Sequence, residues 1–294
     1  NSIKLGKTPN AYLLTGIRGV GKTTTARLIA KALNCLKNSN EKIKCSKEHF
    51  CQSCIEIINS NHIDILEMDA ASKTGIDDVR ELIESSKYSP TSANFKIFII
   101  DEVHMLSKQA FNGLLKTLEE PPPRLKFILA TTEARKIPVT ILSRCQRFDL
   151  KRVNLEKIFL HLKNISKNEG GNISDSALKL IAKASEGSVR DGISLLDRAL
   201  ISQNINDKKE IQDKDVRQML GLADKSKLIF LFKEILSGSQ KEAIINLQEL
   251  IEAGLDAKNF LNDVLEMIYL FNRRINLGPI EKDMLLSESE IQLI

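Results

Sequence analysis

The chain has 294 residues, of which 42% are hydrophobic and 28% charged, and this composition excludes a wholly disordered or fibrous protein. Its apolar runs fall short of the roughly 20 residues that span a bilayer, and no signal-peptide pattern opens it, so we expect a cytoplasmic protein without a membrane segment. The net charge of +5 allows a polyanionic partner without requiring one.

Strand-like and helix-like segments alternate through the first half of the chain, as in a parallel sheet covered by helices. Apolar runs predict strands at 11–15, 96–100 and 127–131, and we expect further strands at 63–68 and 146–150. Apolar residues spaced three or four apart predict helices at 22–36 and 77–86. A further helix is expected to be capped by Ser107 and stopped by Pro121. The pattern therefore predicts an α/β domain in this half of the chain.

After about Lys151 the sequence shows no further strand-like pattern. Helical periodicity predicts helices at 155–169, 174–186 and 188–202, followed by a polar loop at 203–210. From Asp213 onward the chain is again helical, with amphipathic segments at 228–236, 241–253 and 260–271. We expect the apolar faces of these last helices to pack in a core or to form an oligomer contact. Because the chain begins with Asn1, we expect it to be a fragment whose last helical region is truncated.

Residues 16–23 read Gly-Ile-Arg-Gly-Val-Gly-Lys-Thr and match the phosphate-binding pattern G-x-x-x-x-G-K-[ST], with a strand before it and a helix after it. Glycines there let backbone N–H groups curl around a phosphate at a helix N-terminus. Lys22 is expected to reach the β- and γ-phosphates, and the Thr23 hydroxyl to ligate Mg²⁺. This context disfavours the alternative, a glycine-rich turn with a solvated lysine.

Polar residues also follow two later strands. Asp101 and Glu102 come directly after the strand at 96–100, at the end where ligands bind in open α/β sheets. Asp101 suits a Mg²⁺ shell and Glu102 a base that activates water, with an acidic helix cap as the alternative. Thr131 and Thr132 end the fourth strand, where a hydroxyl can hold the attacking water, although such pairs are common at strand ends.

Two nearby residues are less informative. Arg144, in the Ser-Arg-Cys sequence at 143–145, is read as pairing either with a phosphate or with a surface carboxylate. His104 follows the acidic pair without an evident partner, so we favour a helix-surface position over a catalytic one.

Four of the five cysteines fall in one short segment: Cys35, Cys45, Cys51 and Cys54. This grouping favours a metal cluster in a reducing cytoplasm over a secreted disulfide scaffold. Four thiolates satisfy a structural, tetrahedral Zn²⁺ site. The gap between Cys35 and Cys45 is loose, so His49 is an alternative ligand, and four independent thiols are the other interpretation. Cys145 stands apart and is expected to be a packed thiol.

As an ordered set, these motifs resemble the gamma/tau family of bacterial DNA polymerase III subunits, the AAA+ ATPases of the clamp loader. The resemblance rests on the phosphate loop, the inserted cysteines and the segments 69–72, 101–106, 115–122, 130–132 and 141–145. It implies a P-loop parallel-sheet domain at 1–151 with a zinc module inserted at about 35–54. A helical lid at 152–218 and a helical collar for oligomerisation at 219–294 would follow.

The resemblance also implies a role for each matching residue. The Walker A loop around ATP would comprise Gly16, Gly19, Val20, Gly21, Lys22, Thr23 and Thr24. Asp101 and Glu102 would be the Walker B pair, and Thr132 would be sensor 1. Arg144 would be the arginine finger that reaches ATP on a neighbouring subunit. Arg190, in the sequence Gly-Ser-Val-Arg-Asp at 187–191, would be sensor 2 in the lid.

Two departures from the family pattern stand out. Five residues separate Cys45 from Cys51, where the family usually has two, which leaves one metal ligand open. The family also carries a segment before the phosphate loop that helps to hold the adenine, and only ten residues precede Ala11 here.

The implied function is that of the ATPase motor of the clamp loader within a DNA-directed DNA polymerase holoenzyme. ATP, Mg²⁺ and structural Zn²⁺ would be its cofactors. Its partners would be the delta and delta-prime subunits, further gamma/tau copies, the sliding clamp and primed DNA, with polymerase core and helicase reached through further C-terminal regions. One alternative is a non-hydrolysing, delta-prime-like subunit, against which the intact phosphate loop argues. The other is a different AAA+ activity such as branch migration, which the cysteine insertion and Ser-Arg-Cys disfavour.

Overall fold

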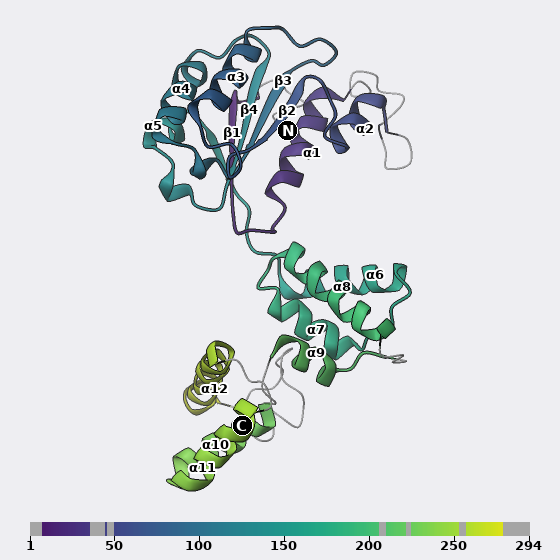
Figure 1. The fold of residues 1–294 in the computed structure, drawn as a ribbon, viewed down its shortest axis with the longest axis vertical. Helices are drawn as coiled ribbons and strands as arrows, with labels where there is room; N and C mark the ends of the chain where they lie inside the picture. Colours follow the sequence, from purple (N-terminus) through teal and green to yellow (C-terminus); the bar gives the residue numbers. More distant parts are fainter. Residues whose placement is uncertain are drawn as a thin grey trace. The chain divides into compact units, whose positions relative to one another are not determined.

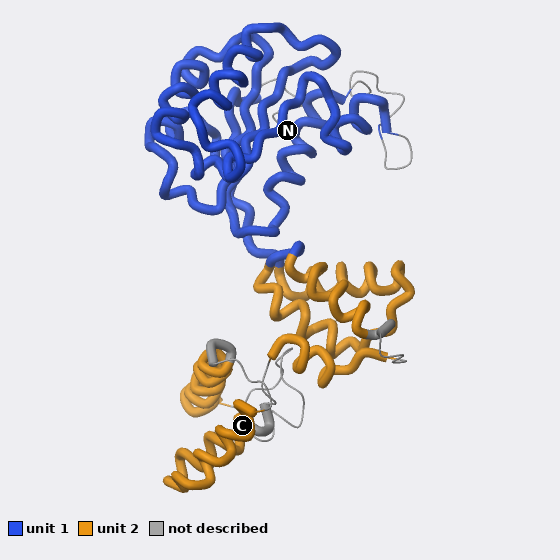
Figure 2. The backbone as a smooth tube through the Cα atoms, in the orientation of Figure 1, with its two compact units in different colours: residues 1–153, 188–190 blue, residues 154–187, 191–294 orange. Residues whose placement is uncertain are grey.

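The computed structural model describes residues 8–35, 45, 50–205, 210–221, 225–252 and 257–278. The chain divides into two compact units, residues 1–153 with 188–190, and residues 154–187 with 191–294 (Figure 2). The three domain ranges expected from the sequence stay predictions. In the described part of the chain, no helix is long and apolar enough to cross a membrane.

The first unit is built on a five-stranded parallel sheet in the order β2-β3-β4-β1-β5 (Figure 1). Its strands lie within two residues of the expected bounds: β1 Ala11–Thr15, β2 Ile65–Asp69, β3 Lys96–Asp101, β4 Leu125–Thr131 and β5 Gln146–Asp149. The strand β4 is buried along its whole length, as expected when helices cover both faces of a sheet.

Helices cover both faces of this sheet (Figure 1). On one face lie α3 (Ile76–Ser86), α4 (Lys108–Glu119) and α5 (Val139–Leu142), and on the other α1 (Lys22–Asn34) and α2 (Gln52–Ile58). Alternate strand residues supply the two cores, because successive side chains of a strand point to opposite faces: Phe98 belongs to the first core and Ile99 to the second. Ser107 caps α4 as predicted, accepting a hydrogen bond from the N–H of Ala110.

Three differences from the sequence predictions have local causes. The strand β2 begins after Asp64, whose buried carboxylate accepts the N–H groups of residues 91–93 and so belongs to a loop contact. The helix α1 ends at Asn34, whose amide exchanges hydrogen bonds of 2.8 and 2.9 Å with the backbone of Phe95. The helices α2 and α5 were not predicted, because seven and four residues are too few to establish a helical period.

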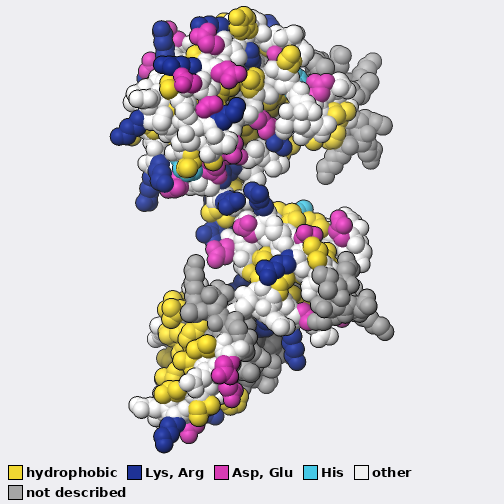
Figure 3. Space-filling model, in the orientation of Figure 1, with side chains coloured by type: hydrophobic (Ala, Val, Ile, Leu, Met, Phe, Trp, Pro, Cys, Tyr) yellow, Lys and Arg dark blue, Asp and Glu magenta, His cyan; other side chains and the backbone are white. Residues whose placement is uncertain are grey.

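In the described residues of the second unit, the elements longer than an isolated bridge are helices, as the sequence indicates. The unit comprises α6 Leu155–Asn168, α7 Asp175–Ala184, α8 Val189–Ile205, α9 Asp213–Leu220, α10 Lys225–Ser237, α11 Gln240–Glu252 and α12 Ala257–Leu277. The helix α8 continues into the predicted loop, since no glycine or proline interrupts it there. Apolar side chains gather over the last helices (Figure 3), and exposed ones include Phe230, Leu236 and Tyr269.

Candidate nucleotide site

The loop between β1 and α1 has the backbone geometry that its glycines allow. Gly16, Gly19 and Gly21 have φ angles of 154°, 74° and 98°, values that favour glycine. A β-carbon on Gly16 would lie 2.6 Å from the carbonyl oxygen of Leu150, and one on Gly19 would lie 2.1 Å from Oγ of Ser188. The loop therefore needs glycine for space as well as for conformation, and it ends at the N-terminus of α1, where the helix dipole favours an anion.

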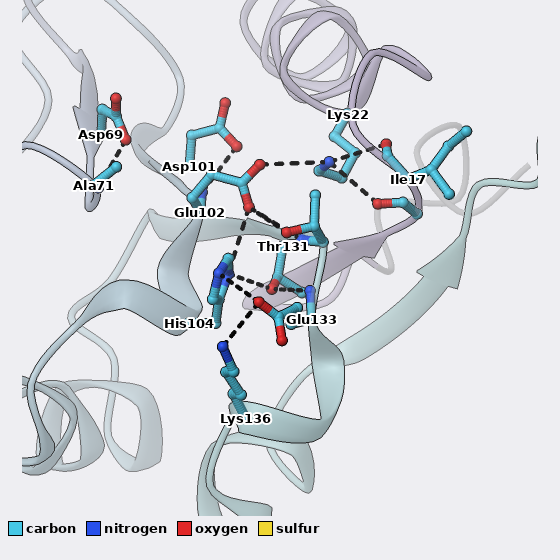
Figure 4. Close-up of polar contacts among 12 residues, drawn as sticks. Ile17, Lys22, Asp69, Ala71, Asp101, Glu102, His104, Thr131, Glu133 and Lys136 are labelled. Carbon is cyan, nitrogen blue, oxygen red and sulfur yellow. Dashed lines mark hydrogen bonds and ion pairs between the residues drawn. The ribbon is translucent and has the colours of Figure 1, made fainter. Parts of the chain in front are cut away.

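Lys22 and Thr23 point from the start of α1 toward the carboxylates that end β3. Lys22 is buried, and its Nζ donates hydrogen bonds of 3.2 Å to the carbonyl oxygens of Gly16 and Ile17. The same Nζ lies 3.7 Å from Oε1 of Glu102 (Figure 4). Thr23 Oγ1 donates to Oδ2 of Asp101 at 2.5 Å. Two other predicted loop residues are less enclosed, since Val20 is half-buried and Thr24 is exposed.

Glu102 connects the ends of β3 and β4. Its Oε2 accepts hydrogen bonds from both the N–H (3.1 Å) and the Oγ1 (3.0 Å) of Thr132. Its backbone is left-handed, with φ 45° and ψ 43°, a conformation that costs a residue with a side chain about 1–2 kcal/mol. Such strain gathers at functional sites, where the surrounding structure maintains it. The strained residue here is the predicted base.

The structure corrects the prediction for His104, which was expected on a helix surface. Only 7% of its side chain is exposed, and it lies in the turn Val103–Met105 that follows Glu102. Its Nδ1 is 3.0 Å from Oγ1 of Thr131 and 3.4 Å from Oε2 of Glu102. No sequence pattern indicated this position, because a three-residue turn has no periodicity and Thr131 comes from another strand.

Glu133 is a second residue that sequence reasoning missed. Its Oε1 lies 3.5 Å from Nε2 of His104 and 2.9 Å from Nζ of Lys136 (Figure 4). The hydrogen bond from Lys136 lowers the pKa of the Glu133 carboxyl below its ordinary value. A connected polar network therefore runs from Lys22 through Glu102 and His104 to the exposed Glu133.

The two predicted arginines occupy different positions. The backbone N–H of Arg190 donates to the carbonyl oxygen of Gly19 at 3.3 Å, so Arg190 adjoins the phosphate loop within the first unit. Arg144 is exposed; it pairs with Glu119 of α4 and donates to the carbonyl oxygen of Thr140 at 2.6 Å. These contacts of Arg144 belong to α4 and α5 and not to the phosphate loop.

The four clustered cysteines meet beside α1 and α2. The Sγ atoms of Cys35, Cys45, Cys51 and Cys54 all lie within 4.8 Å of one another, and three of the residues are buried. Four sulfurs bound to one Zn²⁺ at about 2.3 Å would be nearly 4 Å apart, so the group could hold a metal ion. The N–H of Cys51 donates to Sγ of Cys45 at 3.3 Å, a bond that a metal-bound sulfur could also accept. Cys45 therefore belongs to this group of four thiols despite its spacing in the sequence. His49, the alternative ligand, lies outside the described residues.

The fifth cysteine behaves as predicted. Cys145 packs against the first core, and burial raises the pKa of its thiol to about 11. A thiol in such a setting is unreactive.

Three family models together match nearly the whole chain. The model described as DNA polymerase III, delta subunit, matches residues 1–154. The clamp loader subunit ATPase lid domain of DNA polymerase III matches residues 157–204, and domain III of its gamma and tau subunits matches residues 211–294.

Several curated proteins are similar over most of the chain. The DNA polymerase III subunit gamma of Buchnera aphidicola (subsp. Schizaphis graminum) is 43% identical over 92% of this chain and 72% of the relative. The gamma/tau subunit of Mycoplasma genitalium is 42% identical over 96% of this chain and 46% of the relative. The tau subunit of Escherichia coli is 40% identical over 92% of this chain and 41% of the relative. The chain thus spans most of the gamma relative and less than half of the longer ones.

Among solved structures, the Thermotoga maritima RuvB Holliday junction branch migration motor superposes with a TM-score of 0.54. It is 19% identical to this chain, and the match covers 99% of this chain and 89% of the other. At this identity the likeness concerns the fold, which is that of the AAA+ ATPases.

Proposed function

Because this chain belongs to the gamma/tau family of DNA polymerase III subunits, we propose that the site at the ends of β1, β3 and β4 binds and hydrolyses ATP to drive clamp loading. The chain is an ATPase motor subunit of the clamp loader, which couples ATP binding and hydrolysis to loading of the sliding clamp on primed DNA. The observation that carries the assignment of the site is the convergence of Lys22, Glu102 and Thr132 from three separate elements.

The residues divide the chemistry between them. The phosphate loop and Lys22 would bind the β- and γ-phosphates, and Thr23 with Asp101 would hold Mg²⁺, which neutralises phosphate charge when bound. Glu102, oriented by Thr132, would accept a proton from the attacking water. The water oxygen then bonds to the γ-phosphorus as the bond to the β–γ bridging oxygen breaks, giving ADP and phosphate. Arg190 would contact the nucleotide as sensor 2.

Catalysis is proposed to be completed by other chains. Arg144 is exposed and contacts Glu119 and the carbonyl oxygen of Thr140, a position that suits a finger inserted into a neighbour's site. Further gamma/tau copies, delta, delta-prime, sliding clamp and primed DNA are the proposed partners. Exposed apolar residues on α10 and α12 suit contacts between subunits, and the polymerase core and helicase would bind elsewhere in a longer chain.

The full-length protein, assembled with its partner subunits, provides the direct test. We expect ATP hydrolysis to be stimulated strongly when sliding clamp and primed DNA are both present and weakly when either is omitted. A rate indifferent to both ligands, despite tight Mg-ATP binding, would indicate another AAA+ activity.

The delta-subunit model that matches residues 1–154 supports a second candidate, a subunit that contributes its arginine without hydrolysing ATP. The buried Lys22 and its contact with Glu102 favour the hydrolysing role. Titration with Mg-ATP followed by a hydrolysis assay separates the two, because the non-hydrolysing candidate predicts no turnover whether or not nucleotide binds.

We propose that the cysteine cluster binds one structural Zn²⁺. A purified chain is expected to contain about one zinc by elemental analysis, and Cys54→Ala is expected to remove it. Because metal binding stabilises only the folded state, this variant should also melt roughly 5 °C lower or more. Cys145→Ala, outside the cluster, is the matched control and should keep the metal. Full zinc content in Cys54→Ala would contradict the site.

A further inference from the structure

We infer that His104 is a positioning residue for Glu102. This inference rests on the proposed function, in which Glu102 activates water. The ring of His104, together with Thr132, fixes the direction of the Glu102 carboxylate, and Glu133 in turn fixes the ring.

The contacts around Glu102 show which directions are constrained. Its Oε2 has Thr132 on one side, with N–H and Oγ1 at 3.1 and 3.0 Å, and Nδ1 of His104 on the other, at 3.4 Å. Its Oε1 faces Nζ of Lys22 at 3.7 Å. In the proposed reaction Lys22 contacts the phosphates, so Thr132 and His104 are the described contacts that still restrain the carboxylate once nucleotide is bound.

The contacts around Thr131 show what the two ring nitrogens of His104 face. Thr131 is fully buried, and its Oγ1 accepts the N–H of Glu133 at 3.0 Å. Nδ1 of His104 lies 3.0 Å from the same hydroxyl oxygen. Nδ1 also faces Oε2 of Glu102 at 3.4 Å, so a proton on Nδ1 is donated toward these two oxygens, while Nε2 faces Oε1 of Glu133 at 3.5 Å. The ring is thus held at both nitrogens (Figure 4).

The backbone supports the same conclusion. Glu102 and His104 are separated by a single residue. The backbone of Glu102 is left-handed, and the N–H of Met105 donates a 2.9 Å hydrogen bond to the carbonyl oxygen of Glu102, which closes the turn. This turn directs His104 back toward β4. A histidine that served only to fill the core would not need two carboxylates and a buried hydroxyl at its nitrogens. The strained turn aims both side chains at the end of β4.

Two substitutions of His104 separate positioning from packing. His104→Leu keeps much of the volume and loses both nitrogens, and His104→Asn keeps a polar atom near the position of Nδ1. In the assembled complex with clamp and primed DNA, we expect His104→Leu to lower kcat about 10- to 100-fold, because a small misplacement of a catalytic group has such effects. Its affinity for a non-hydrolysable ATP analogue should stay unchanged, and His104→Asn should recover most of kcat.

The decisive measurement combines His104→Leu with Glu102→Gln under single-turnover conditions. If His104 acts through Glu102, the double variant should hydrolyse ATP as slowly as Glu102→Gln alone, because contacting residues with a shared role are not additive. An equal fold-loss in both backgrounds, or an unchanged kcat in His104→Leu, overturns the inference. A Glu102→Gln variant with wild-type hydrolysis would instead refute the base assigned under the proposed function, so the two failures are distinguishable.

Discussion

In the assembled complex, Arg144→Ala is expected to bind ATP normally and to hydrolyse it about 10³-fold or more slowly, since an arginine finger is worth roughly 10³–10⁵ in rate. The finger neutralises charge that develops on the transferred phosphoryl group, so its loss affects the reaction more than binding. In the free chain Arg144 is paired with Glu119 on the surface. Because exposed pairs contribute only about 0–1 kcal/mol, moving the arginine to a neighbour's site costs little.

Mixing two inactive variants tests whether Arg144 acts on another subunit. A subunit with Arg144→Ala keeps its base, and one with Glu102→Gln keeps its finger, so complexes containing both should recover hydrolysis at some interfaces. An arginine that acts within its own chain would give no recovery. Arg80→Ala removes another exposed, ion-paired arginine and serves as the control, with unchanged turnover expected. ATP binding and hydrolysis are followed separately for each complex.

The second large effect concerns the base itself. Glu102→Gln is expected to reduce hydrolysis about 10²- to 10⁴-fold, the usual contribution of general acid–base catalysis, while Mg-ATP still binds. The amide has nearly the same shape as the carboxylate, and its carbonyl oxygen can still accept both hydrogen bonds from Thr132. The fold of the site should therefore persist without a group able to take a proton from water.

Asp101→Asn provides the contrast for this experiment. Asp101 accepts the Thr23 hydroxyl and is assigned to Mg²⁺, so its variant should require more Mg²⁺ for nucleotide binding. The Glu102 variant should show the wild-type Mg²⁺ dependence of binding. Identical behaviour of the two variants would argue against dividing base and metal ligand between these neighbours.

The sequence predicted β1, β3 and β4 well because these strands are covered on both faces and therefore appear as nearly uninterrupted apolar runs. Residues 97–100 are almost completely buried, and such a run has few alternative interpretations. The phosphate loop was equally predictable, since its glycines, lysine and threonine occur at fixed spacing between a strand and a helix. The predicted meeting of Asp101, Glu102 and Thr132 follows from the parallel pairing of β3 with β4.

What could not be predicted depends on contacts between distant segments. The burial of His104 requires the left-handed backbone of Glu102, which no residue pattern indicates. Cys45 was predicted as a member of the cluster, but its loose spacing left His49 open as an alternative ligand, and only the fold brings its Sγ within 4.8 Å of the other three. The end of α1 depends on Phe95, a residue far along the chain whose contact with Asn34 has no local signature.

The position of β1 in the sheet has a consequence for how the protein is made. Ala11 pairs with Phe127 on one side, and Tyr12 with Gln146 on the other, so β1 lacks both neighbours until β4 and β5 have left the ribosome. Closing such long segments is slow because the entropy of the intervening chain must be lost first. The phosphate loop extends from β1, and a nascent chain therefore acquires its nucleotide site only when the whole sheet forms.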